Sequence, residues 1–362
     1  MIIYSIVLAA TTALAYYVHK PETLPSNGIT RQQLVNRICL CGIFLMLFSV
    51  SALRYQVGND YSRYEEYFYN IWYGFVVPTE RGFNATVKLL EYLFGRECYL
   101  LIFAFFAFAT VYFTLKALYL LGKNFVFSFF LFMAFGYYYQ SLNTVRYYFA
   151  VALAMYAVTY LFRRQYMKFI LLILLAASFH KSVLLVIPIY LLANCRWRLW
   201  QVILLTAVSA STFLLKDVYL RMVLYLYPTY RDTIYLEGGA SYINIARCLL
   251  IMLLCLIFRK ENWAKEKQML FYCRLNIGAF LLYTCGTFLP EVSRIGTYMT
   301  VMQVFLLPGM VDSITDKRKK KWIGAGIILF GLLYYAAFLY KAQGMYVKLL
   351  PYRTWLFGVC DQ

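Results

Sequence analysis

Long runs of apolar residues follow one another along the chain and are separated by short polar segments. A helix of about 20 apolar residues is long enough to cross a bilayer, so each run predicts a membrane-spanning helix. About twelve such helices are predicted, at residues 2–18, 36–53, 98–121, 125–141, 143–162, 166–179, 181–194, 199–215, 243–258, 269–289, 293–312 and 322–340. The pattern therefore predicts an all-α polytopic membrane protein.

Two of these runs are short and meet at His180 and Lys181. They are either two tilted spans or a hairpin pair of half-helices that meet within the membrane, and in both cases the chain returns to the side from which it came. The two longest polar segments, 54–97 and 216–242, are rich in Tyr, Arg and acidic residues, and we expect them to be partly helical along the interface. Since neither is a soluble domain of any size, residues 1–362 are predicted to form a single transmembrane domain.

The distribution of Lys and Arg between the polar segments predicts which side each segment faces. Cytoplasmic loops carry an excess of Lys and Arg, and with the N-terminus outside, the inside segments hold 19 of them against five acidic residues. The outside segments hold 14 Lys and Arg and eleven acidic residues, although they are longer in total. The run DKRKKK at 316–321 anchors the end of one span inside. Both termini and the segments 54–97 and 216–242 are therefore predicted to be extracytoplasmic.

The composition agrees with a protein whose solvent is lipid. Hydrophobic residues make up 63% of the chain and charged residues 14%, whereas soluble domains carry about 25% charged residues. The net charge of +19 does not indicate nucleic-acid binding, because cationic loops retained in the cytoplasm explain it. The nine Cys residues lie mostly in apolar segments without a CxxC pair, so neither a disulfide framework nor a metal site is predicted. The N-terminal run lacks the basic region of a cleavable signal peptide and is interpreted as the first span.

Polar residues that need an explanation gather at the predicted outside face. An ionisable side chain at the centre of a membrane helix costs about 2.5–3.5 kcal/mol on insertion scales, so it indicates a cavity unless it reaches the interface. Arg274, about one turn inside the cytoplasmic face, fits the interface explanation. The candidate site residues of the outside face are Arg54, Asp60, Asn143, Arg146, His180, Lys181, Arg294 and Arg353, with Arg231 and Arg247 near the same face.

The chemistry of this set suits an anionic lipid headgroup such as a diphosphate. Asn143 and Arg146 are three residues apart and share a helical face, and Arg146 offers a fork of donors that matches phosphate oxygens. His180 is one of only two His residues, and a neutral imidazole accepts a proton near neutral pH. Glu291 and Arg294 are also three apart, where a local ion pair is the simpler explanation. The many Tyr rings offer surfaces on which sugars stack, and the chain has no P-loop, GxSxG or HExxH motif.

Three segments resemble the EpsG family of Wzy-like exopolysaccharide polymerases. RYQVGNDYSRYEEYF at 54–68 is similar to that family's R-x-x-x-G-x-D-Y-x-x-Y signature. Residues 143–192, in which NTVRYY opens an Ala-rich helix and AASFHKSV leads to a Pro-containing helix, resemble its central block. LLPYR at 349–353 is similar to its C-terminal element. The resemblance spans nearly the whole chain in length and order, and the central block is its most specific part.

The resemblance implies a glycosyltransferase of GT-C-like architecture that polymerises lipid-linked oligosaccharide repeat units outside the bacterial cytoplasmic membrane. In such enzymes a growing glycan moves from undecaprenyl diphosphate to the non-reducing end of a new lipid-linked repeat, and no nucleotide sugar, metal or other cofactor is implied. Carried onto this chain, Arg146 and Arg294 hold the diphosphate, and either His180 or Asp60 orients or deprotonates the acceptor hydroxyl. A flippase and a chain-length regulator are the implied protein partners.

Two other functions stay open beside the polymerase. A transporter or flippase of lipid-linked oligosaccharide needs ionisable or broken-helix sites near the bilayer midplane and access from both faces, whereas the cationic residues of this chain crowd one rim. An O-antigen-type ligase would instead transfer the glycan to a different acceptor.

Overall fold

The computed structural model describes residues 1–19, 29–226, 241–287, 292–344 and 347–357. Within these residues the regular structure is helical, apart from one isolated β-bridge between Arg54 and Thr354. Contacts within the chain define two compact units. Unit 1 comprises Met1–Leu184 with Arg318–Gln362, and unit 2 comprises Leu185–Lys317. The single transmembrane domain over residues 1–362 stays a prediction.

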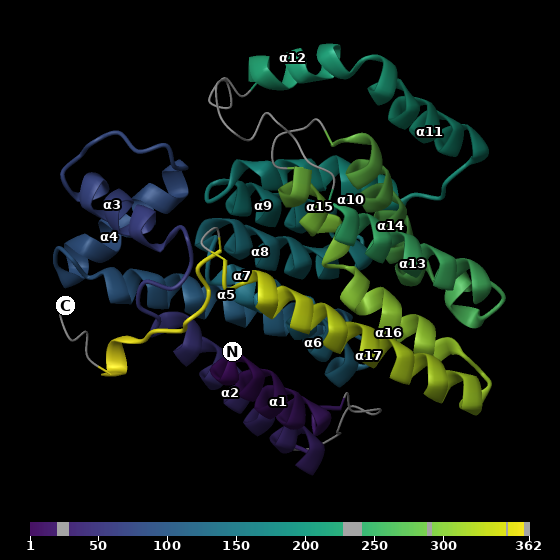
Figure 1. The fold of residues 1–362 in the computed structure, drawn as a ribbon, viewed down its shortest axis with the longest axis horizontal. Coiled ribbons are helices and arrows are strands. Elements are labelled where there is room, and N and C mark those ends of the chain that lie inside the picture. The colour runs from purple at the N-terminus through teal and green to yellow at the C-terminus, as the bar shows by residue number, and fades with distance from the viewer. Residues whose placement is uncertain (20–28, 227–240, 288–291, 345–346, 358–362) are drawn as a thin grey trace. The chain divides into compact units, whose positions relative to one another are not determined.

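Unit 1 combines the N-terminal helices with one long helix from much later in the chain (Figure 1). Its helices are α1 (Ile2–Tyr16), α2 (Arg31–Ala52), α3 (Tyr61–Trp72), α4 (Arg81–Phe94), α5 (Tyr99–Leu121), α6 (Phe125–Ala134), α7 (Tyr137–Ser141), α8 (Val145–Phe162), α9 (Tyr166–Ala177), η1 (Lys181–Leu185), α17 (Lys317–Lys341) and η5 (Trp355–Phe357). α5 packs against both α2 and α8, and α8 packs on α9. α17 packs on α7, where the rings of Tyr335 and Tyr139 lie 5.6 Å apart.

Unit 2 is built around one central helix, α14. Its helices are α10 (Val186–Asn194), α11 (Leu199–Leu214), α12 (Lys216–Leu226), α13 (Tyr242–Ile257), η4 (Asn262–Lys265), α14 (Lys267–Cys285), α15 (Val292–Thr300) and α16 (Gln303–Ser313). α14 contacts α10, α11, α13, α15 and α16. A buried hydrogen bond of 2.7 Å from the Gln303 side chain to Asn276 Oδ1 joins α16 to α14.

The lengths of the helices bear on how the chain crosses a bilayer. Four of the described helices, α2, α5, α8 and α17, are long and apolar enough to do so. α11 and α12 meet at 93° and add a fifth span if the bent pair counts as one. α1, α6, α9, η1 with α10, and α13 are apolar but only 10–17 residues long. The chain is therefore an all-α polytopic membrane protein, while the count of about twelve spans and the GT-C-like architecture stay predictions.

Two of the runs predicted as single helices are each broken into two. The run at 125–141 is interrupted at Gly136, whose φ of +80° is a left-handed conformation that favours glycine. A Cβ atom there would also lie 2.9 Å from a ring carbon of Phe338, so no side chain fits without movement. The run at 293–312 divides between α15 and α16. The break predicted at His180 is present, since α9 ends at Ala177 and η1 begins at Lys181.

The predicted outside segment 54–97 folds into two helices in contact, α3 and α4, which confirms its partly helical character. Each helix buries one face, because apolar residues recur three to four positions apart. On α3 these residues include Tyr64 and Phe68, and on α4 Phe83 is completely buried. Tyr64 and Phe68 pack edge-on against Phe103 of α5, and Phe83 packs against Phe106 of the same helix. A buried aromatic side chain contributes about 1.5–3 kcal/mol, so the pair is anchored firmly on α5.

Candidate functional site

The loop between α2 and α3 packs against the residues just before α8, and Gly58 makes the closest approach. Gly58 has a φ of +99°, and a Cβ atom there would lie 2.8 Å from the carbonyl oxygen of Leu142. Only glycine therefore allows the two backbones to approach so closely. The approach lets the backbone N–H of Asp60 donate to Oδ1 of Asn143 at 3.0 Å. The structure thus brings together Asp60 and Asn143, which are 83 residues apart in the sequence.

Arg146 lies in the first turn of α8 and forms an ion pair with Glu80, the residue directly before α4. The exposed fraction of the side chain is 15% for Arg146 and 14% for Glu80. The second carboxylate oxygen of Glu80 accepts a hydrogen bond of 3.1 Å from the backbone N–H of Lys181. The guanidinium lies over the ring of Phe83, with its Cζ 5.2 Å from the ring centroid. An anion is therefore held between a guanidinium and a backbone N–H.

The junction after α9 contacts the start of α4. The carbonyl oxygen of Ser178 accepts hydrogen bonds from the backbone N–H groups of Gly82 at 2.9 Å and Phe83 at 3.3 Å. In His180, Nδ1 lies 2.8 Å from the Ser182 hydroxyl, and the ring packs edge-on against Tyr147 at 5.2 Å. Because Lys181, the next residue in the chain, donates its backbone N–H to Glu80, the imidazole belongs to the same junction as the anion-holding group. Asp60, Asn143, Arg146, His180 and Lys181 are therefore gathered at one end of unit 1.

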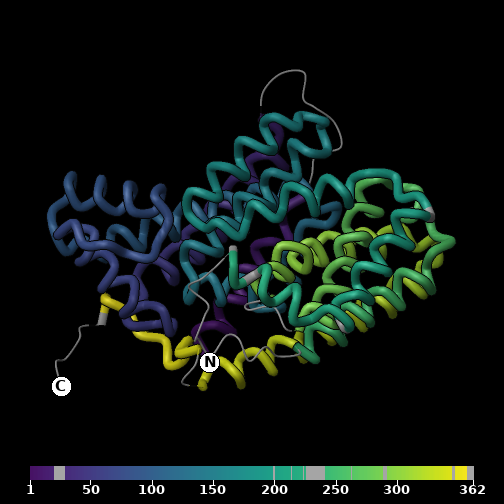
Figure 2. Tube along the Cα trace, turned by 90° about the horizontal axis from the view of Figure 1, so that it is seen from above, coloured from purple at the N-terminus to yellow at the C-terminus, as the bar shows by residue number. Residues whose placement is uncertain are grey.

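The segment at residues 347–357 covers the end of α2 (Figure 2). The backbone N–H of Tyr55 donates to Arg353 O at 3.0 Å, next to the bridge between Arg54 and Thr354. Arg54 is only 1% exposed, and its guanidinium donates to the Ser51 carbonyl and lies 4.7 Å from the Phe103 ring centroid. Burial lowers the pKa of Arg54. The structure thus places Arg54 in the interior and leaves Arg353 exposed at the surface.

The remaining candidate cations are not part of unit 1. Arg247 is buried on α13, where it donates to Asn244 Oδ1 at 3.1 Å. Arg294 is partly exposed on α15. Arg231 and Glu291 lie outside the described residues. Arg274 donates to the carbonyl oxygen of Ala193 at 2.9 Å, in keeping with a structural role.

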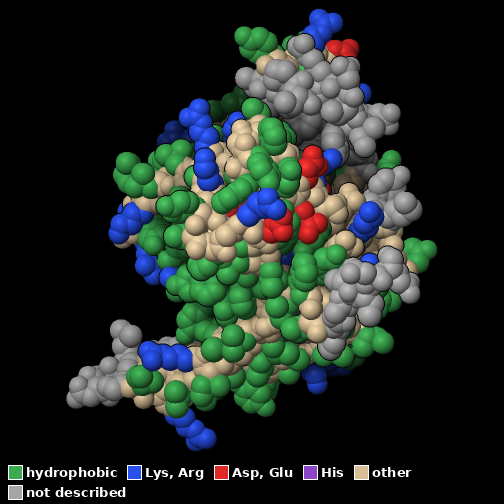
Figure 3. Space-filling view, turned by 90° about the vertical axis from the view of Figure 1, so that its left-hand side faces the viewer, with side chains coloured by type: hydrophobic (Ala, Val, Ile, Leu, Met, Phe, Trp, Pro, Cys, Tyr) green, Lys and Arg blue, Asp and Glu red, His purple; other side chains and the backbone are tan. Residues whose placement is uncertain are grey.

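Glu80 is the residue of this site that the sequence did not indicate. The segment 54–97 contains six acidic residues, and nothing in their spacing relates any of them to Arg146, which lies on another helix. Only the electrostatics of Arg146 point to such a partner. Its side chain is 15% exposed in the structure, and a guanidinium so far removed from water needs a nearby anion. On the face shown in Figure 3, acidic and basic side chains do lie next to one another within a mostly hydrophobic surface.

Two further acidic or polar features of unit 1 lie away from this group. Glu91 is 1% exposed on the inner face of α4, and burial raises its pKa to about 7.

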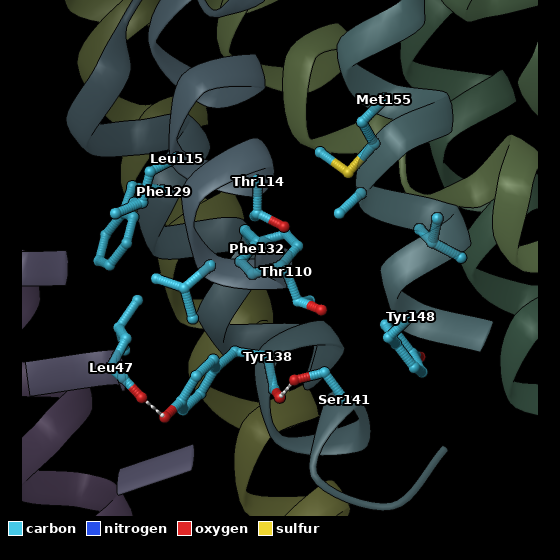
Figure 4. A pocket seen from close by; sticks show the side chains of 13 residues that line it. Leu47, Thr110, Thr114, Leu115, Phe129, Phe132, Tyr138, Ser141, Tyr148 and Met155 are labelled. Carbon is cyan, nitrogen blue, oxygen red and sulfur yellow. Dashed lines mark hydrogen bonds between the residues drawn. The ribbon is translucent and has the colours of Figure 1, made fainter. Parts of the chain in front are cut away.

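A narrow cavity between α5, α6 and α8 leaves only about 10 Å³ open to the centre of a water molecule. Figure 4 shows the Thr110 and Thr114 side chains lining it, with the Tyr138 hydroxyl donating to Leu47 O at 2.7 Å. The cavity has room for about one water molecule and none for a sugar.

Comparison with known proteins gives one match. Residues 37–354 match the family model described as the EpsG family. The matched range includes the α3–α4 pair, the junction after α9 and residues 347–354 of the segment that covers Arg54. No curated protein and no solved structure matches the chain.

Proposed function

The chain belongs to the EpsG family, which links it to exopolysaccharide synthesis, and on that premise we propose that it is a polysaccharide polymerase. In this proposal it joins oligosaccharide repeat units carried on undecaprenyl diphosphate. The reaction takes place at the extracytoplasmic face of the bacterial cytoplasmic membrane, and both termini lie on that side. A flippase supplies the repeat units, and a chain-length regulator acts on the product.

One observation carries the proposal. The Arg146 guanidinium and the Lys181 backbone N–H together hold an anion, and His180, the residue before Lys181, packs on Tyr147, the residue after Arg146. A group that neutralises negative charge therefore stands beside a group that accepts a proton. Transfer of a sugar from a lipid diphosphate to a hydroxyl needs both.

The bond changes assign a role to each group. The bond between the anomeric carbon and the diphosphate oxygen breaks, and the acceptor hydroxyl oxygen bonds to that carbon. Negative charge develops on the diphosphate, where Arg146 stabilises it, with Arg294 as a second cation. The hydroxyl proton passes to His180, or to Asp60 if that carboxylate is the base. Lys181, Asn143, Arg247, Arg231 and Arg353 are further candidate contacts for the substrate, whereas Arg54 is too buried to be one without rearrangement.

Reconstitution tests the proposal and separates it from its rivals. Purified protein in proteoliposomes is given lipid-linked repeat units, and elongation and transbilayer movement are both measured. We expect elongation on the same lipid carrier. Movement without any elongation would identify a transporter, and glycan found only on a different acceptor would identify a ligase.

A pair of variants identifies the proton acceptor. His180→Ala should lose elongation while the protein level in the membrane stays normal, and His19→Ala is the matched control because it removes the other His. Asp60→Asn keeps the backbone N–H that binds Asn143. If Asp60→Asn abolishes elongation and His180→Ala retains it, then Asp60 is the base.

A further inference from the structure

The anion in the Arg146 site is a side chain of the protein itself. Both oxygens of the Glu80 carboxylate are used there, one by the Arg146 guanidinium and the other by the Lys181 backbone N–H. A phosphate oxygen pair presents the same charge sign and the same acceptor geometry to these donors. Glu80 therefore occupies the position that the proposed function gives to the donor diphosphate.

Glu80 is placed so that its side chain can leave Arg146 and return to it. It precedes α4 with an extended backbone, at φ −75° and ψ 151°, and its side chain makes no capping hydrogen bond to that helix. At the same helix start, the hydroxyl of Thr79 contacts the Asn84 side chain. Rotation of the Glu80 side chain therefore breaks no capping hydrogen bond of α4, and it gives up the contacts to Arg146 and to the Lys181 backbone N–H.

The partly buried guanidinium of Arg146 also gives Glu80 a role when substrate is absent. The Nε atom of Arg146 is buried and has no partner in the described part of the chain. Removing one partner of a buried ion pair is strongly destabilising, because it leaves an uncompensated charge. Glu80 thus keeps Arg146 paired and oriented over Phe83 until a stronger anion arrives.

We propose that Glu80 is an exchangeable internal anion, which occupies the Arg146–Lys181 site in the empty enzyme and gives it up to the diphosphate of the lipid-linked donor. This inference rests on the proposed function. Since Glu80 carries one negative charge, it competes well with singly charged ligands and poorly with a diphosphate, which makes the site selective. Glu80 returns to Arg146 once the diphosphate product has left.

Binding of a sugar-free lipid diphosphate tests the exchange. Geranylgeranyl diphosphate is titrated into the full-length protein in nanodiscs, for the wild type, Glu80→Gln and Arg146→Ala. Glu80→Gln removes the competing charge and keeps the shape of the side chain, so we expect about tenfold tighter binding. Glu66→Gln, an exposed site on α3, is the matched control and should bind like the wild type.

The two opposite outcomes for Glu80→Gln decide the role of this residue. Weaker or unchanged binding would show that Glu80 is only a positioning partner of Arg146 and would overturn the exchange. Should Glu80→Gln fail to fold, Glu80→Asp provides the same test, because the shorter side chain competes less well and should also tighten binding. A second readout is selectivity, since the preference for diphosphate over geranylgeranyl monophosphate should fall in both variants.

Failure of the exchange is distinguishable from failure of the proposed function. If the wild type binds no lipid diphosphate and Arg146→Ala changes nothing, then the site does not take this ligand and both proposals are wrong. If the wild type binds, Arg146→Ala does not, and Glu80→Gln binds no tighter, then only the exchange is wrong.

Discussion

Arg146 and Arg54 each lie over an aromatic ring of unit 1, Phe83 and Phe103 respectively, yet their surroundings differ in kind. Arg146 is partly open, is paired with a carboxylate and lies beside His180. Arg54 is closed off by the bridge to Thr354, and the bond that its side chain donates goes to a backbone carbonyl. The comparison teaches that an Arg at the end of a membrane helix is a ligand-binding candidate only where its environment leaves a way in. Otherwise its charge is part of the packing.

The largest effect is expected at Arg146 itself. If the chain is the proposed polymerase, Arg146→Ala removes the group that stabilises the leaving diphosphate, so elongation should fall about 100- to 1,000-fold in reconstituted membranes. Arg146→Lys should also be impaired, because an ammonium lacks the planar fork of donors. Arg81→Ala, an exposed Arg on the neighbouring helix, is the control. Full activity in Arg146→Lys would show that a plain charge suffices there.

A stability effect is expected at Arg54. Arg54→Ala leaves a cavity beneath the 347–357 segment and should lower the free energy of unfolding by about 3 kcal/mol. Arg54→Met fills the same space without a buried charge and should restore most of that stability together with activity. Thermal unfolding in detergent and elongation are measured on the same preparations. A stable but inactive Arg54→Met protein would move Arg54 into the functional site and remove the contrast with Arg146.

A smaller, pH-dependent effect is expected at Glu91. The fold favours the neutral carboxyl, since burial raises its pKa from 4.5 to about 7. The stabilisation of the neutral form is fully present below pH 4.5 and is lost as the pH rises through 7. Glu91→Gln should therefore stabilise the protein by about 2 kcal/mol at pH 8 and by little at pH 4.5. Unfolding measured at the two pH values checks this, and an equal shift at both would contradict it.

The smallest effect is expected at Arg353. Its side chain is exposed, and the contact to Tyr55 uses only its backbone carbonyl. Arg353→Ala should therefore leave thermal stability within about 0.5 kcal/mol of the wild type. If the side chain attracts the anionic substrate, the KM for the lipid-linked repeat rises a few-fold at low salt and the difference disappears at high salt. An unchanged KM at both salt concentrations would remove Arg353 from the substrate contacts.

The sequence predicted the positions of helices well, because lipid imposes a long, simple pattern. The run at 98–121 corresponds to α5, which begins at Tyr99, and the run at 143–162 corresponds to α8. The break at Gly136 was missed, since an isolated glycine is tolerated in a helix and only the approach of Phe338 requires one there.

The candidate site was predicted in part, because the order of the spans also predicts which residues share a face. Asp60, Asn143, Arg146 and His180 were grouped because topology placed them on one face, and unit 1 does bring them together. The pairing of Arg146 with Glu80 and the burial of Arg54 depend on contacts between distant segments. No local pattern encodes such contacts, so neither was visible in the sequence. Whether Arg294 joins the group stays a prediction.

The bridge between Arg54 and Thr354 also has a consequence for biosynthesis. Residues 349–355 leave the ribosome only after the whole of unit 2. The loop that carries Asp60 can therefore pair with them only after about 290 further residues have been made and inserted. During that interval Arg54 has no cover from the later segment. A nascent chain stalled before residue 349 should therefore be trapped by chaperones or degraded, because the cover over Arg54 forms only after unit 2 has been made.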